Sequence, residues 1–525
     1  MDYRLLMAFA TGTQLLFVFA FGACIGSLIN VLVYRLPRGL GVVTPPSRCP
    51  ACSTRLTWRE NIPILGWIIL KGRCRTCRVR ISPEYPIVET IVALLFLAVF
   101  VLWYTVPAHR AMWLGFDWAA VRPEWAANGF ARTWPMFVLL MALLSCLVAM
   151  TIVDARTFTI PLVLAWVPTL AALIVHPLHA LWLDLSDRTL HSLAAGWSWV
   201  IASPGPTGWL WVGAAVGGVV GVLAANALLA SGLIRRSFAD YETWEAAQRA
   251  TERVAEPPSL PPEQDPSHTP PEAGSVPATA DSGNSRLALR AGIAVGGTLA
   301  CTFVGGIVGS VLGKPPIAGG LFGLVLGPIV AGFAARLCTR SASSDAAHPD
   351  DEDPTALWIA YPHARREVTR ELLFLGPIVA LALVGAALGL RLSNASHLPS
   401  TVPLWLDALS GALLGYLVGG GMIWATRVFG TLAFGKEAMG LGDVHLLAAV
   451  GACLGWIDAT LAFFIAPFIA IYFAAVLMAW TGSPRRAMPY GPYLTGAVLV
   501  VTLAKPAIEA GLTRIFGLAV PLNIP

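Results

Sequence analysis

The chain has 525 residues, of which 56% are hydrophobic and only 12% are charged. This composition excludes an ordinary soluble globular protein, and the formal net charge of +5 is too small to indicate a nucleic-acid partner. Apolar runs of about eighteen or more residues recur along the chain. Because a segment that crosses a lipid bilayer must satisfy its own backbone hydrogen bonds, the sequence predicts an all-α polytopic membrane protein.

Hydropathy predicts about 12 transmembrane helices. We place them at residues 14–34, 86–106, 135–153, 160–177, 208–233, 291–312, 317–337, 372–390, 404–426, 444–457, 459–480 and 493–515. The first apolar run lacks the small-residue ending of a cleavable signal peptide, so we expect it to be a retained span. Basic residues cluster after alternate spans, and the positive-inside rule places those loops in the cytoplasm.

Four cysteines lie in one polar segment after the first span, as two Cys-x-x-Cys pairs with a spacer of about twenty residues. Cys49 and Cys52 form one pair, and Cys74 and Cys77 form the other. This spacing is typical of a structural Zn²⁺ site with four thiolate ligands. Disulfides are the alternative, but the predicted cytoplasmic location is reducing. The metal would order a segment that is too small to build its own core.

Two acidic residues stand out because they lie at the ends of apolar helices. Asp154 follows a long apolar span, and Asp443 lies in a glycine-bounded turn before another apolar helix. For either residue alone, a helix N-cap is the alternative interpretation. Counting spans places both residues at the cytoplasmic side of the membrane. Because ionisable residues inside a membrane are costly and usually functional, the two together favour a catalytic pair.

A pair of carboxyl groups suits aspartic-protease chemistry. Two carboxyls within a few ångströms of each other share one proton, since both cannot ionise. The ionised group then takes a proton from water while the protonated group polarises the peptide carbonyl. Gly440 and Gly442, which precede Asp443, would let the backbone and a substrate approach its carboxylate closely.

Five motifs together resemble the type IV prepilin peptidases, a family of bacterial inner-membrane leader peptidases and N-methyltransferases. They are FGACIGSLINVLVYRLPRG at residues 21–39, the four-Cys segment at 49–89, DARTFTIP at 154–161, KEAMGLGDVHLLAAVGACLGW at 436–456 and MPYGPYL at 488–494. The Gly-x-Gly-Asp element is shared with presenilin-type intramembrane aspartic proteases, which have no such four-Cys segment.

The resemblance implies an intramembrane endopeptidase that removes the basic leader of type IV prepilins or pseudopilins at the cytoplasmic face of the bacterial inner membrane. Asp154 and Asp443 correspond to its catalytic pair. It also implies methylation of the new N-terminal amine with S-adenosylmethionine. No conventional glycine loop for the methyl donor is evident, so methylation rests on the resemblance alone and its binding residues are unassigned.

The chain departs from the family pattern near the second aspartate. His445 stands where the family usually has lysine. A protonated histidine would tune the aspartate pair or hold substrate, and the alternative is a polar residue at the membrane interface. Lys436, Gly440 and Gly442 complete the expected supporting residues.

The chain also departs in length, because family members have a far shorter connection between the two aspartates. We expect a first span at 1–36, the zinc segment at 37–85, a membrane core with Asp154 at 86–177, inserted spans at 178–403 and a membrane core with Asp443 at 404–525. The insertion includes two acidic tracts, 237–290 and 341–354, which predict disordered linkers. Within it, residues 361–372 form a basic juxtamembrane segment that we expect to contact anionic lipid.

Two other functions stay open. A proton-coupled transporter could relay protons through Asp154 and Asp443, but it would not require the four-Cys segment. A catalytically inactive membrane scaffold built around the zinc segment would account for the cysteines and for His445.

Overall fold

The computed structural model describes residues 3–44, 46–106, 112–113, 116–117, 121–186, 201, 208–241, 244, 363–394, 399, 401–481 and 488–517. The predicted spans 291–312 and 317–337 lie outside these residues, as do the tract 341–354 and most of the tract 237–290.

Nine described helices are long and apolar enough to cross a membrane, which confirms the all-α membrane class. They are α1 (Tyr3–Arg35), α3 (Glu84–Phe100), α4 (Phe130–Thr157), α5 (Leu162–Ser186), α6 (Gly208–Ala230), α10 (Ala364–Asn394), α11 (Leu404–Phe434), α13 (Trp456–Thr481) and α14 (Gly491–Ile515). The described residues therefore do not confirm the expected count of twelve. The predicted span 444–457 corresponds to α12 (Leu441–Leu454), whose 14 residues extend only about 21 Å, too short to cross a bilayer.

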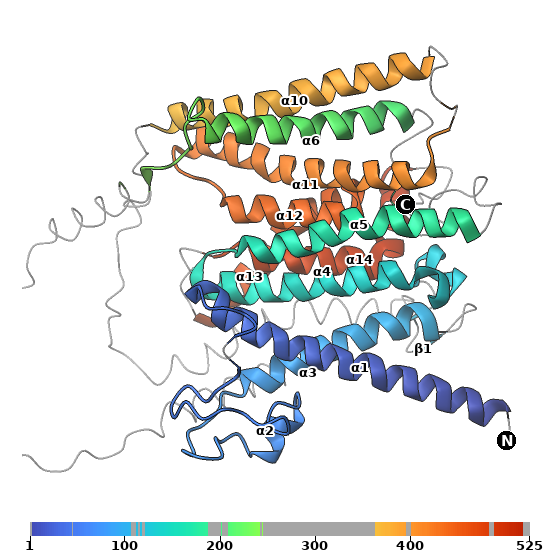
Figure 1. The fold of residues 1–525 in the computed structure, drawn as a ribbon, viewed down its shortest axis with the longest axis vertical. Coiled ribbons are helices and arrows are strands. Elements are labelled where there is room, and N and C mark those ends of the chain that lie inside the picture. Colours follow the sequence, from blue (N-terminus) through green and yellow to red (C-terminus); the bar gives the residue numbers. More distant parts are fainter. Residues whose placement is uncertain are drawn as a thin grey trace, which may run out of the picture.

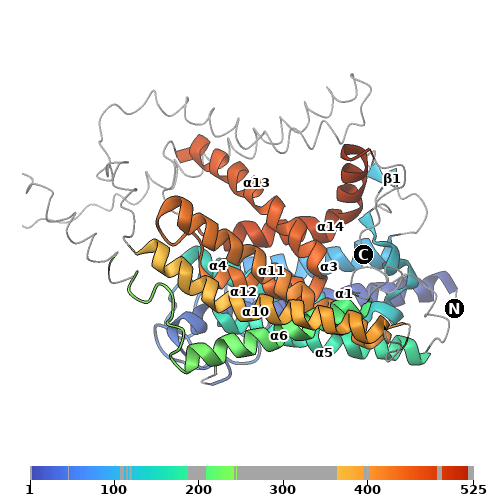
Figure 2. The ribbon, with the colours of Figure 1, turned by 90° about the horizontal axis from the view of Figure 1, so that it is seen from above.

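The helices run alongside one another, from α1 and α3 at one edge to α6 and α10 at the other (Figure 1). The view turned by 90° shows α13 and α14 on one side of this array (Figure 2). The shorter elements are η1 (Leu36–Arg38), α2 (Leu65–Ile69), η2 (Val101–Thr105), β1 (Met112–Trp113), β2 (Phe116–Asp117) and η4 (Glu124–Asn128). The two strands pair in an antiparallel manner.

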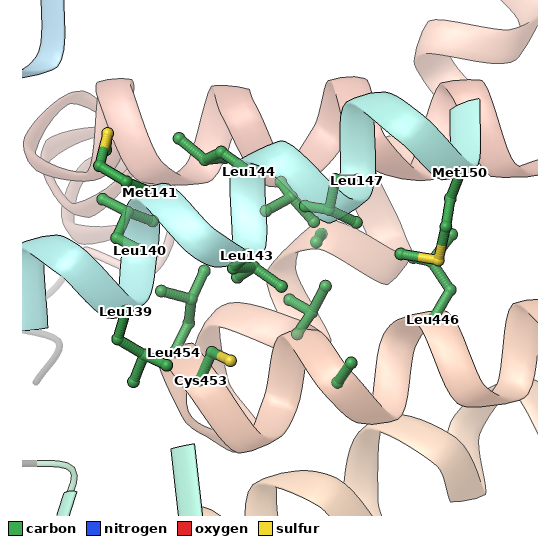
Figure 3. Close-up of a cluster of buried hydrophobic side chains, with 14 of the residues drawn as sticks. Leu139, Leu140, Met141, Leu143, Leu144, Leu147, Met150, Leu446, Cys453 and Leu454 are labelled. Carbon is green, nitrogen blue, oxygen red and sulfur yellow. The ribbon is translucent and has the colours of Figure 1, made fainter. Parts of the chain in front are cut away.

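The core surrounds α12, from which nearly every residue after Gly442 is buried. Leucine and methionine side chains of α4 pack against Leu446, Cys453 and Leu454 of α12 (Figure 3). On another side, α11 crosses α12 at glycines: a Cβ on Gly415 would overlap the carbonyl group of Gly451. This close approach lets the long helices enclose the short helix α12. The first turn of α12, which carries Asp443, lies at one end of the bundle.

Two further pairs of helices pack through glycine. A Cβ on Gly22 of α1 would lie 2.8 Å from Ala93 Cα, and one on Gly26 would lie 2.6 Å from Glu89 Cα, both on α3. Glycines also line the contact between α6 and α10, and both pairs are antiparallel. Close backbone approach is how membrane helices gain packing energy, because lipid supplies little hydrophobic driving force between them.

Candidate active site

Asp154 lies in the last turn of α4, and its side chain is 6% exposed. The helix ends at Thr157 because Phe158 turns into the left-handed region, with φ of 53°, and donates its amide to the Asp154 carbonyl at 2.9 Å. Asp154 therefore lies in the last turn of α4 and does not precede a helix as an N-cap residue would. The N-cap interpretation is wrong for this residue.

Asp443 is the third residue of α12 and is 9% exposed. Gly440 is the N-cap residue, and its backbone hydrogen-bonds to the Asp443 carboxylate. This bond satisfies a donor at the helix start, as an acidic residue at this position commonly does. The other oxygen, Oδ1, is buried and makes no hydrogen bond within the described residues. A buried carboxylate oxygen without a partner is costly for a purely structural residue.

The structure brings the two acids together. α4 contacts α12, and the carboxyl groups of Asp154 and Asp443 interact electrostatically. Gly442 contributes to this approach, because a Cβ at that position would lie 2.8 Å from Cβ of Ile160, which lies in the connection between α4 and α5. The start of α12 therefore packs against the segment that follows Asp154.

The start of α14 interacts with both acids. The amide of Gly491 donates to Asp154 Oδ2 at 3.2 Å, and Tyr490 interacts electrostatically with Asp443. One turn further on, Thr495 of α14 accepts a hydrogen bond from Thr151 of α4 at 2.9 Å. We did not include Gly491 among the predicted site residues. The MPYGPYL motif that contains it was the only signal in the sequence.

The other predicted supporting residues lie close to Asp443 along the chain. His445 is half-buried, and its ring lies 5.9 Å from that of Trp166 on α5. Lys436 is half-buried in the connection between α11 and α12, whereas Gly440 is exposed. The histidine ring therefore lies beside the indole of Trp166.

The four predicted metal ligands form one cluster. Their sulfur atoms all lie within 4.8 Å of one another, with Cys49 Sγ 3.8 Å from Cys77 Sγ and Cys52 Sγ 3.9 Å from Cys74 Sγ. These separations exclude disulfides, whose sulfurs would be about 2.05 Å apart. They match a tetrahedron with Zn–S bonds of about 2.3 Å, whose edges are about 3.8 Å. The cluster could therefore hold a metal ion.

The two Cys-x-x-Cys pairs repeat one backbone conformation. The backbones of Arg48 and Arg55 form an isolated antiparallel β-bridge around the first pair, and those of Arg73 and Arg80 form one around the second. In each pair, the residue after the second cysteine has a positive φ, 55° at Ser53 and 59° at Arg78. Two matching turns that aim their thiols at one point are typical of a structural zinc site.

The four-Cys segment is joined to the membrane helices by Glu89 of α3, which is 7% exposed. Its carboxylate accepts the amide of Ile64 at 2.6 Å and also hydrogen-bonds with Ser27 and Asn30 of α1. Asn30 in turn donates to the carbonyl of Tyr85 at 3.1 Å. The aspartates lie at the same end of the bundle, since Arg156 near the end of α4 pairs with Glu84 at the start of α3 at 2.9 Å.

Two family models match separate parts of the chain. The Bacterial Peptidase A24 N-terminal domain matches residues 20–103, which include the four cysteines. The Type IV leader peptidase family matches residues 366–482, which include Asp443. Residues 104–365, with Asp154, lie between the two matches. The second match also takes in most of α10, which we assigned to the insertion.

The chain is similar to prepilin leader peptidase/N-methyltransferases of several bacteria. It is 50% identical to that of Myxococcus xanthus over 82 residues, which cover 16% of this chain and 24% of the relative. It is 43% identical to that of Klebsiella pneumoniae over 86 residues, covering 15% and 38%. It is 38% identical to that of Aeromonas hydrophila over 141 residues, covering 21% and 49%. The alignments thus span at most about half the length of these relatives. No solved structure matches the chain significantly.

Proposed function

We propose that this chain, which resembles the type IV prepilin peptidases and has a long insertion, is an intramembrane aspartic endopeptidase. Its substrates would be type IV prepilins or pseudopilins, cut at the cytoplasmic face of a bacterial inner membrane. The observation that carries the proposal is that the start of α12 packs against the segment that follows α4. This packing brings two buried acids, Asp154 and Asp443, into electrostatic interaction at the end of the bundle that holds the four-Cys segment.

The two carboxyls would share one proton, because both cannot be ionised at short range inside the membrane. The ionised member accepts a proton from the attacking water, and the protonated member donates a hydrogen bond to the scissile carbonyl. The Gly491 amide holds one oxygen of Asp154, and the Gly440 backbone holds the Asp443 carboxylate. Asp443 Oδ1 is then the oxygen available to the shared proton or to substrate.

Two cofactors belong to the proposal. Zn²⁺ bound by Cys49, Cys52, Cys74 and Cys77 would order the segment without entering the reaction. S-adenosylmethionine would supply the methyl group for N-methylation of the cleaved product. The support for methylation is the name that the relatives carry, and we assign no residues to it.

The test uses membranes that contain the full chain and a peptide with a basic leader, a Gly-Phe junction and an apolar helix. The cleavage products are identified by mass spectrometry. We expect Asp154→Asn and Asp443→Asn each to lower the cleavage rate by at least about 10²-fold, because each removes one member of the acid–base pair. Asp184→Asn is the matched control, because Asp184 lies near the C-terminal end of α5, whereas Asp154 precedes the start of that helix.

Cleavage at the wild-type rate by either Asp154→Asn or Asp443→Asn would refute the proposed catalytic pair. A chain that carries protons into liposomes but cuts no peptide would be a transporter. A chain that does neither while retaining zinc would be the inactive scaffold. The peptidase proposal requires cleavage by the wild-type chain that depends on both acids.

A further inference from the structure

Arg427 of α11 is a fully buried cation, only 1% exposed, about two turns before the end of its helix. It belongs to neither the aspartate pair nor the four-Cys segment. A buried guanidinium must be matched by anions and hydrogen-bond acceptors on all sides, since desolvating it alone is very unfavourable. Its partners therefore identify the segments that it ties together.

On one side, Arg427 holds the connection that leads into the second aspartate. Its Nη1 donates both to the carboxylate of Glu437 and to the main-chain carbonyl of Met439. Met439 directly precedes Gly440, the N-cap residue of the helix that carries Asp443. The guanidinium thus binds the connection between α11 and α12 through the Glu437 side chain and the Met439 backbone. Met439 lies one residue before the turn that orients the proposed catalytic carboxylate of Asp443.

On the other side, Arg427 is held by α10. Its Nε donates to Glu371 Oε1 at 2.6 Å, and Glu371 is also 1% exposed. Ser237, which follows α6, donates to the same oxygen at 3.2 Å. The guanidinium lies over the ring of Phe238, 4.8 Å from its centroid. The amide of Phe238 donates to Glu367 of α10 at 2.8 Å.

The helices that supply these contacts pack as one unit. A Cβ on Gly221 of α6 would lie 2.5 Å from Ile378 Cα, and Cβ atoms on Gly213 and Gly217 would overlap carbonyl oxygens of α10. Helix α6 and Phe238 lie in the part of the chain that neither family model matches. Within the segment 361–372, which we expect to contact anionic lipid, Arg365 and Arg366 are exposed, whereas Glu367 and Glu371 are buried in the protein.

We propose that the α6–α10 pair, of which α6 lies outside both family matches, positions Asp443 through Arg427. Glu371 and Phe238 fix the guanidinium, which fixes the connection before Gly440 and so the orientation of the Asp443 carboxylate relative to Asp154. Arg427 and Glu371 are positioning residues in this scheme. Its catalytic consequence rests on the proposed peptidase function, whereas its structural part does not.

The decisive experiment is hydrogen–deuterium exchange on the purified full chain. In Glu371→Gln and Arg427→Gln we expect faster amide exchange in residues 436–443, by about 10-fold, with α1, α3 and α4 unchanged. Glutamine at 371 keeps the shape of the side chain and removes its charge. Arg391→Gln, an exposed charge removal in the last turn of α10, is the control and should leave the exchange of 436–443 as in the wild type.

Peptide cleavage gives the second readout. We expect Glu371→Gln to lower kcat by about 10-fold with KM within about 2-fold, since a shifted carboxylate affects the reacting geometry more than substrate binding. Arg427→Lys, which keeps the charge, should recover part of the kcat lost in Arg427→Gln.

Unchanged exchange of residues 436–443 in Glu371→Gln would overturn the inference, whatever happens to cleavage. Faster exchange throughout the helices would overturn it too, because the residue would then stabilise the protein in general. If the wild-type chain cuts no prepilin-like peptide, the proposed function fails, and the exchange data alone still decide whether α10 orders the Asp443 connection.

Discussion

The backbone amide of Gly491 hydrogen-bonds to the Oδ2 atom of Asp154 at 3.2 Å, although the two residues belong to helices at distant positions in the chain. The contact leaves no room for a side chain, because a Cβ on Gly491 would lie 2.6 Å from that same oxygen. The preceding residue, Tyr490, interacts electrostatically with Asp443. The start of α14 thus hydrogen-bonds to one acid and interacts electrostatically with the other.

Gly491→Ala tests this relationship. The added methyl group would displace the Asp154 carboxylate, and misplacing a reacting group by about 1 Å can cost about 10²-fold in rate. We expect kcat/KM for a prepilin-like peptide to fall by about that factor. Gly511→Ala, on the same helix, adds a Cβ that meets no neighbouring helix or side chain within 4 Å and should retain wild-type activity. Equal rates in the two variants would contradict a role for the Gly491 contact.

Metal analysis tests the four-Cys cluster. The purified protein should contain about one equivalent of zinc, and Cys49→Ser or Cys74→Ser should lose it, because three thiolates bind the ion more weakly than four. Cys146→Ser, in α4, should keep the metal. Removal of the metal by a chelator should make residues 47–81 sensitive to protease. A metal-free preparation with full activity and an intact segment would refute the structural zinc site.

Glu89→Gln tests how the four-Cys segment is attached to α3. The substitution replaces a charged acceptor of the Ile64 amide by a neutral one, and hydrogen bonds to charged groups are worth about 1.5–3 kcal/mol. Local opening should become about 10-fold more frequent, seen as faster limited proteolysis of residues 47–81. Glu84→Gln, an exposed position on the same helix, is the control. Unchanged proteolysis in Glu89→Gln would mean that other contacts hold the segment.

Lys505→Met tests a buried ion pair between α13 and α14. Lys505 Nζ lies 3.0 Å from Asp458 Oδ1, and both side chains are largely buried. Removing one partner leaves a buried charge, which typically costs about 3–5 kcal/mol. We expect a lower thermal unfolding temperature in detergent, and recovery of much of the loss in the double variant Asp458→Leu/Lys505→Met. A single variant as stable as the wild type would show that the pair contributes little.

Among the described residues, the sequence located the long helices well, because each must place an apolar stretch in the bilayer and satisfy its own backbone hydrogen bonds. It also identified the four cysteines, since thiolate spacing within one short segment determines which sulfurs can meet a common ion. It was less reliable for α12, which is apolar like a span but too short to be one. Hydropathy alone cannot distinguish a lipid-facing helix from one that protein encloses.

What the sequence by itself determined is local: the membrane class, the helix positions, the thiol pairs and the two acidic residues that merit attention. Only the tertiary structure placed Gly491 on Asp154 and Arg427 between Glu371 and the connection to Asp443. The physical reason is that these contacts join helices distant in sequence. Their existence depends on how glycine-lined helices pack, and no local pattern of residues specifies that packing.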